Sequence, residues 1–254
     1  MTTESSPPVY KDIPLALLRT AAFQTGKKDS FTMASSHMTL SHNSIIRGYN
    51  GIYQQAPRVQ KPSDIRDFIA YCLAWHQLVE GHHYHEEVRY FPAIEKVTGQ
   101  KGVMDGEVEQ HAAFHAGLKS FKDYLSDLKT PEVDFKSKRL LEIMDSFSQP
   151  LYTHLAAEPQ ALLALSRFAS PDRQFDLVKI EREEGKKMVN LDFALNVLPM
   201  FLNNMESVEF EGGMWRRDSG VVMWIMKNVL PLWNRRIWRF MSCTSDGRRK
   251  TLAV

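Results

Sequence analysis

Histidine and glutamate side chains recur at helical spacing along this chain, and they fall on apolar positions of four separate segments. His42 stands alone in the first segment. Each of the other three segments carries a pair of residues four apart: His82 with Glu86, His111 with His115, and His154 with Glu158. Residues four apart lie one above the other on the same face of an α-helix, so each pair can direct two side chains toward one centre. We therefore expect a helical fold that brings these seven side chains together.

The apolar residues around these side chains follow the i, i+3, i+4 pattern of amphipathic helices. The four segments run from residue 33 to 55, from 64 to Gly99, from Gly102 to just before Pro131, and from about 134 to 168. Helices of this length with short connections are typical of an antiparallel up-down four-helix bundle. No strand pattern of comparable strength is present in the sequence. We predict an all-α fold.

The predicted bundle, residues 33–170, leaves an N-terminal leader (1–32) and a C-terminal tail (171–254). The tail contains two further helical segments, around 191–205 and 221–240. It also holds four of the five tryptophans: Trp215, Trp224, Trp233 and Trp238. Because such aromatic density usually reflects packing, we expect the tail to be a helical extension that packs on the bundle as part of the same domain.

Composition and charge exclude several classes of protein. The 32 basic and 30 acidic residues leave a net charge near +2, which argues against nucleic-acid and acidic-lipid partners. Two cysteines cannot build a disulfide framework, so a reducing compartment is favoured. No secretory signal is visible, and the most apolar window, 221–233, is shorter than the roughly 20 residues that span a bilayer. We expect a cytoplasmic protein without a membrane partner.

Seven potential ligands indicate a metal centre. Burying that many ionisable groups is costly unless a metal or strong pairing compensates. Seven exceed the four ligands of a structural zinc site, and the usual thiolates are missing. The set suits two metals that share bridging carboxylates. Nitrogen-rich ligation with a few carboxylates favours iron over manganese or zinc.

The sequence around these residues resembles the hemerythrin-like HHE cation-binding family. The similarity covers residues 42–165 and rests on four short motifs taken together. They read His-Asn-Ser-Ile-Ile-Arg from His42, His-His-Tyr-His-Glu-Glu from His82 with Tyr-Phe-Pro beyond it, Glu-Gln-His from Glu109 with Phe-His at 114–115, and His-Leu-Ala-Ala-Glu from His154.

The resemblance implies a di-iron site that binds dioxygen. Its ligand pattern implies two irons bridged by Glu86, by Glu158 and by an oxo or hydroxo group. One iron would be completed by His111, His115 and His154. The other would be held by His42 and His82 and would keep an open position, where dioxygen binds.

Two features leave the ligand set open. His83 and Glu87 form an alternative pair one residue later, about 100° round the helix; the apolar stripe is centred nearer His82 and Glu86. If His83 is not a ligand, it could orient one. Pro159 directly follows Glu158. It removes one helical hydrogen bond and should kink the fourth helix just beyond the site.

Three functions fit such a site. Dioxygen binding ranks first, because the resemblance implies it. The second is a di-iron oxidase or oxygenase acting on a small organic substrate, with Met214, Trp215, Met223 and Trp224 lining its pocket. Ferritin-like oxygenases use two Glu-x-x-His motifs, whereas this chain has one match, from Glu80 to His83. The third is an iron or oxygen sensor whose fold depends on metal.

Overall fold

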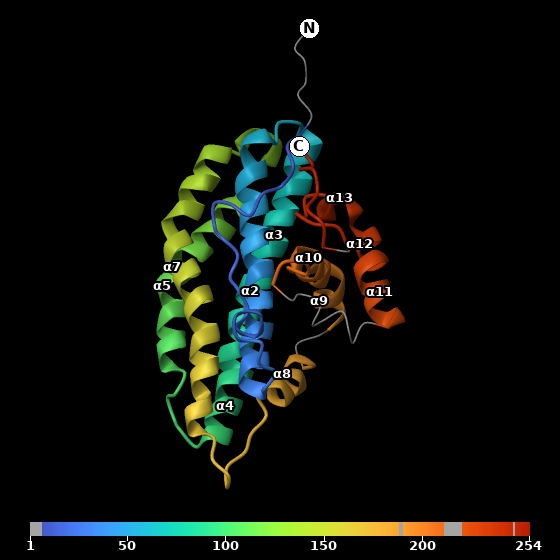
Figure 1. Cartoon of the computed structure of the whole chain (residues 1–254). Helices are drawn as coiled ribbons and strands as arrows, with labels where there is room; N and C mark the ends of the chain where they lie inside the picture. Colours follow the sequence, from blue (N-terminus) through green and yellow to red (C-terminus); the bar gives the residue numbers. More distant parts are fainter. Residues whose placement is uncertain (1–6, 188–189, 211–219, 246) are drawn as a thin grey trace.

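The computed structural model describes residues 7–187, 190–210, 220–245 and 247–254. Over these residues the fold is all-helical, as predicted: no strand occurs in the described ranges, and β-pairing is limited to isolated bridges such as Val9 with Thr251. Four long helices lie side by side (Figure 1). They are α2 (Ser30–Gln55), α3 (Pro62–His85), α5 (Asp105–Ser126) and α7 (Ser137–Ala164).

Helix α2 is buried along most of its length because the leader covers one of its faces. Asp29 caps the helix by accepting hydrogen bonds from the amides of Phe31 and Thr32. The side-chain amide of Asn43 pairs with both backbone groups of Leu18, at 2.8 and 2.9 Å. Two turns later the side-chain amide of Asn50 forms the same pair of hydrogen bonds with the backbone of Leu15, at 3.0 and 2.8 Å. These bonds satisfy buried polar groups and fix the leader against the helix.

The predicted second helix is interrupted by a wider turn. Helix α3 leads through a π-helical turn, η2 (Glu86–Tyr90), into α4 (Phe91–Thr98), which ends at Gly99 with φ 67°. Pro92 has no amide hydrogen to donate to the carbonyl of Val88, so regular α-helical bonding fails here. The π turn adds a residue to the helix and changes the direction of the side chains that follow it.

Close packing between the long helices holds their register. Trp75 lies fully buried on α3, and its ring NH donates to the carbonyl of Ile45 on α2 at 3.0 Å. A side chain at Gly48 would overlap this indole ring, so glycine is needed for the close approach. On the other side the Trp75 ring lies 5.4 Å from Phe121 on α5. Trp75 thus packs between α2 and α5.

Helix α7 passes through both of its prolines without ending. It includes Pro150 and Pro159 and extends to Ala164, where the 3-10 turn η3 (Leu165–Phe168) takes over. The helix thus continues through Pro159, where a kink was predicted, and Glu158 remains on a helical turn. Its side chain is fully buried.

Short helices complete the chain. They are α1 (Ala21–Thr25), η1 (Ala56–Arg58), α6 (Pro131–Asp134), α8 (Leu177–Gly185), α9 (Leu191–Asn196), α10 (Leu198–Asn204), α11 (Val221–Asn228), α12 (Leu230–Trp233) and α13 (Arg235–Trp238). Helix α10 packs on α2, where the Ser44 hydroxyl donates to the carbonyl of Phe201 at 2.8 Å. None of the helices in the described ranges has both the length and the hydropathy that a bilayer crossing requires.

The tryptophans of the tail do not all pack. Trp238 on α13 is buried against the core, as predicted. Trp224 and Trp233 are 61% and 70% exposed, so the prediction that they pack on the bundle is wrong. Residues 214 and 215 and the side chain of Met223, expected to line a substrate pocket, lie outside the described residues.

Candidate metal centre

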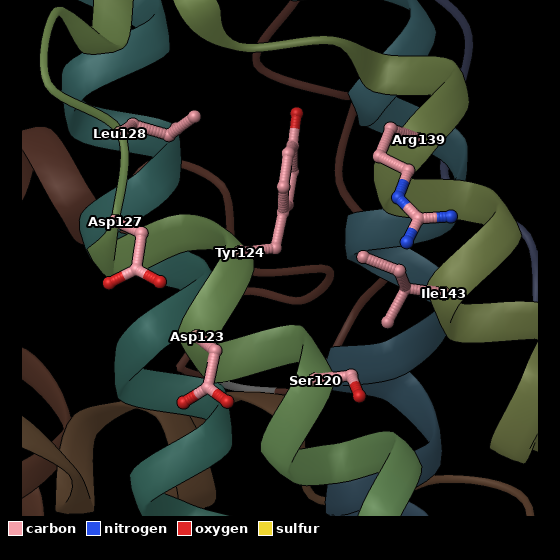
Figure 2. Close-up of a pocket in the computed structure, with 7 residues that line it drawn as sticks. All are labelled: Ser120, Asp123, Tyr124, Asp127, Leu128, Arg139 and Ile143. Carbon is pink, nitrogen blue, oxygen red and sulfur yellow. The ribbon is translucent and has the colours of Figure 1, made fainter.

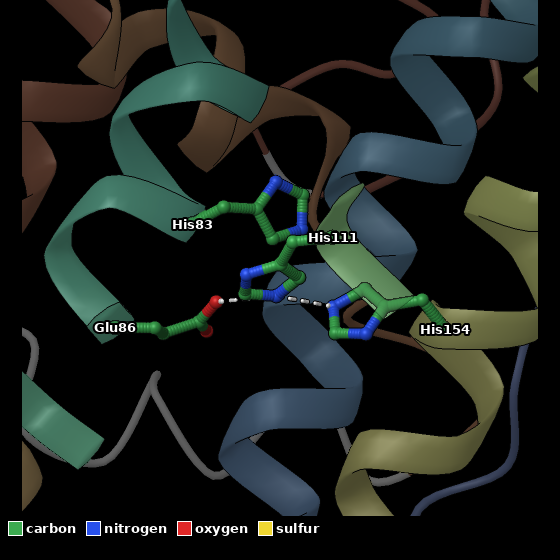
Figure 3. A group of neighbouring side chains, drawn as sticks. All are labelled: His83, Glu86, His111 and His154. Atoms are coloured by element: carbon green, nitrogen blue, oxygen red, sulfur yellow. Dashed lines mark hydrogen bonds and ion pairs between the residues drawn. The ribbon is translucent and has the colours of Figure 1, made fainter. Parts of the chain in front are cut away.

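Buried histidine and glutamate side chains from four helices meet between the long helices. They form two groups, each with ligand atoms within 4.8 Å of one another. The first group is His42, His82, Glu86 and Glu158. The second, drawn in Figure 3, is His83, Glu86, His111 and His154. Glu86 belongs to both groups.

The first group is compact around His42. The Nε2 atom of His42 lies 3.1 Å from Nε2 of His82 and 3.2 Å from Oε2 of Glu158. The Nε2 atom of His82 lies 3.0 Å from Oε1 of Glu86. Two ring nitrogens and two carboxylate oxygens therefore converge on one point.

The second group mirrors this arrangement on the other side of Glu86. Nε2 of His111 lies 3.1 Å from Nε2 of His154 and 3.8 Å from Oε2 of Glu86 (Figure 3). The His83 ring is centred 4.5 Å from the His111 ring. Oε2 of Glu158 lies 3.6 Å from Nε2 of His154, besides its contact with His42. Both carboxylates thus stand between the two groups.

The orphaned polar atoms of this centre indicate a cation. Both ring nitrogens of His83 and all four carboxylate oxygens of Glu86 and Glu158 are buried without a hydrogen-bond partner. Such groups are rarely left unsatisfied, and ionised ones are costly to bury alone. Two imidazole nitrogens bound at right angles to one metal, about 2.1 Å from it, would lie about 3.0 Å apart. The two histidine pairs meet this spacing, so the residues fit a pair of metal ions.

Burial sets the charge state of the ligands. Desolvation lowers the pKa of His82 and His83 well below the usual value, and neighbouring histidines lower it further. Desolvation likewise lowers the pKa of His154 to about 3. These three histidines are therefore neutral and can offer lone pairs. Desolvation raises the pKa of Glu86, and the nearby Glu158 raises it further. A bound cation would offset the cost of burying the negative charge and keep the carboxylate ionised.

Outer hydrogen bonds orient two of the imidazoles, and a carboxylate lies near Nδ1 of a third. Nδ1 of His111 lies 2.7 Å from Oε1 of Glu87, and Nδ1 of His42 donates to the carbonyl of Leu155 at 2.7 Å. Nδ1 of His154 lies 3.5 Å from Oε2 of Glu107, without hydrogen-bond geometry. A proton held at Nδ1 leaves the lone pair on Nε2, which faces the centre in each case.

Six of the seven predicted residues come together in the structure: His42, His82, Glu86, His111, His154 and Glu158. His115 does not: it is exposed on α5 and belongs to neither group. The buried face of α5 runs through His111, Phe114, Leu118 and onward with alternating steps of three and four, which turns position 115 outward.

One histidine and two acidic residues outside the preferred ligand set lie at the centre: His83 and Glu87, which the sequence left open as an alternative pair, and Glu107, which it did not single out. His83 enters the second group beside Glu86, three residues later, so this i, i+3 pair was a readable signal. Glu87, considered as a ligand with His83, instead contacts His111 from the solvent side. Glu107 precedes His111 by four residues on the same helix face, which was also a readable signal.

A surface pocket lies away from this centre. It has a volume of about 400 Å³ and is lined by residues of α5 and α7, including Ser120, Tyr124 and Arg139 (Figure 2). Its nearest lining residue on α5 lies nine positions beyond His111, about 13 Å along the helix. The pocket does not open onto the metal ligands.

The comparison with known protein families agrees with this geometry. Residues 33–184, more than half of the chain, match the family model "Hemerythrin HHE cation binding domain". The chain belongs to this family. It is 29% identical over 215 residues to the "Dimeric xanthone biosynthesis cluster protein R11" of Cryptosporiopsis sp. (strain 8999). That alignment covers 83% of this chain and 79% of the relative. No solved structure gave a significant match.

Proposed function

We propose that the chain is a non-haem di-iron protein whose four long helices form an antiparallel up-down bundle around the metals. The observation that carries the proposal is the position of Glu86, with one oxygen toward each group. His42 and His82 would hold one iron; His83, His111 and His154 would hold the other. Glu86 and Glu158 would bridge them, with an oxo or hydroxo group. His83 thus takes the place first assigned to His115.

The chemistry of such a centre is the binding and reduction of dioxygen. Iron supplies the electrons when bound, and the protein supplies the surroundings. Burial excludes water from His42, His154 and Glu158. His82 is more accessible, with 15% of its side chain exposed, which supports entry of dioxygen on the side of the first group. That group also offers fewer histidines, and so has more room for a further ligand.

We further propose that this reaction serves an oxidase or oxygenase of small organic compounds. The relative's name assigns it to a xanthone biosynthesis cluster, a setting that favours an enzyme. The negative charge around the centre also supports an oxidase or oxygenase. Only two carboxylates were expected from the sequence, but Glu87 and Glu107 contact two of the histidines. Four carboxylates stabilise highly charged iron better than two.

A dioxygen carrier is the second candidate, supported by the five histidines of the two groups. Mixing the reduced protein with oxygen distinguishes the two functions. Continuing oxygen consumption with reductant, accelerated by particular small aromatic compounds, supports the enzyme. A new optical spectrum that persists and reverses when oxygen is removed supports the carrier. If the reduced protein consumes no oxygen and its optical spectrum does not change with oxygen, both functions are contradicted. A cytoplasmic location remains a prediction.

A further inference from the structure

Helix α11 is apolar on two sides, and the residues that the structure describes pack against only one of them. Met226 and Leu230 pack inward beside Leu202 in a small buried cluster. The opposite side is exposed and continues onto α12. We define it as the tryptophan face: Val221, Trp224, Ile225, Val229, Leu232 and Trp233. Helix α11 stands at the outer edge of the molecule, away from α5 and α7 (Figure 1).

The spacing of these residues makes one continuous surface. Positions 221, 224, 225 and 229 follow the i, i+3, i+4, i+8 pattern of a single helix face. Large apolar side chains gathered in an exposed patch usually mark a binding surface. Because both tryptophans are more than half exposed, folding does not use most of their apolar area.

The charge beside this face selects the partner. Residues 219–245 contain no Asp or Glu but four basic residues: Lys227, Arg235, Arg236 and Arg239. Arg239 pairs with Asp64 at 2.7 Å, whereas Arg235 and Arg236 are exposed directly after Trp233. The whole chain carries only +2, so the basic charge is concentrated here. The net charge of the whole chain argued against acidic-lipid partners, but this local group of basic residues favours them.

We propose that the tryptophan face, with Arg235 and Arg236, docks on an anionic lipid surface. Tryptophan prefers the boundary between headgroups and acyl chains, and arginine binds the phosphates and carboxylates of anionic headgroups. With eight and four residues, α11 and α12 are too short to cross a bilayer and lie in its interface. A second copy of the chain fits less well. Residues 219–245 offer no acidic side chain to the arginines of a second copy.

Vesicle sedimentation of the full chain tests this proposal. The probes are vesicles of phosphatidylcholine with phosphatidylserine, and vesicles of phosphatidylcholine alone. The wild-type chain should bind the mixed vesicles more tightly, and salt should weaken that binding. The double change Trp224→Ser and Trp233→Ser should lower the partition coefficient roughly tenfold or more. Changing Arg235 and Arg236 to Gln should lower it about fivefold per arginine on mixed vesicles only.

The matched control is Val133→Ser, an exposed apolar residue on α6 outside the tryptophan face. It should bind like the wild type. Absence of binding to the mixed vesicles would overturn the proposal, as would equal losses in the control. Sedimentation velocity supplies a further test. If the wild-type chain self-associates without binding vesicles, and the double tryptophan variant is monomeric, the occupant is a second copy instead.

Discussion

Replacing His83 by alanine should disable the second metal group, whereas the same change at His115 should leave it intact. His83 is buried with both ring nitrogens unpartnered, and His115 is exposed on α5. Structural zinc sites with four ligands bind their metal with about 10–16 kcal/mol, which sets the scale for a four-ligand site. Removing one of the four donors of the second group therefore costs about 3 kcal/mol, or roughly 150-fold in affinity. The loss at His115 should be near zero.

The assay is an anaerobic titration of the metal-free chain with ferrous iron against a competing chelator. Circular dichroism of each variant, with and without metal, shows whether the fold is retained. His83→Gln is a second variant that keeps more of the side-chain volume and should bind as weakly as His83→Ala. The account is refuted if His115→Ala loses the second iron while both His83 variants keep it.

Three further predictions concern neighbouring groups. Glu87→Ala should weaken iron binding roughly 10- to 100-fold, because Nδ1 of His111 loses its hydrogen-bond acceptor. Glu87→Gln should restore much of the affinity, because its amide oxygen can still accept that hydrogen bond. Equal losses in the two variants would show that the negative charge of Glu87 matters instead. Glu86→Ala should lower the iron content of both groups, whereas the exposed Glu109→Ala should not, as metal analysis would show. In the metal-free chain, three site histidines with depressed pKa values, His154 at about 3, bind fewer protons folded than unfolded. The stability that they contribute is present above about pH 6.5 and is lost as pH falls; for His154 the loss is about 2 kcal/mol by pH 5. The raised pKa values of Glu86 and Glu107 act in the opposite direction and reduce this loss of stability. Urea unfolding across that range measures it, and unchanged stability would contradict the charge assignment.

The helices and most of the centre were predictable because both depend on local periodicity. The i, i+4 spacing of His154 and Glu158 survives in the structure, since α7 remains helical through Pro159. Position 115 was not predictable from pair spacing alone. The face of α5 is set by where Phe114 and Phe121 pack against other helices, and that contact turns the neighbouring histidine outward.

Two further features of the structure were not predicted from the sequence. The π turn at Glu86 follows from Pro92 six positions later, and it allows Glu86 and Glu87 to face different partners. The exposure of Trp224 depends on how far the tail reaches over the bundle, which no local pattern encodes. Aromatic content predicted packing on the bundle, which holds for Trp238 but not for Trp224 and Trp233.

Iron stoichiometry tests the central claim most directly. The metal-free full chain, titrated with ferrous iron in the absence of oxygen and then freed of excess metal, should retain about two irons per chain. Mössbauer spectra should show two sites with nitrogen and oxygen ligands, because the two groups differ in their number of histidines. A reproducible content of one iron, or zinc that binds and excludes iron, would contradict the di-iron centre.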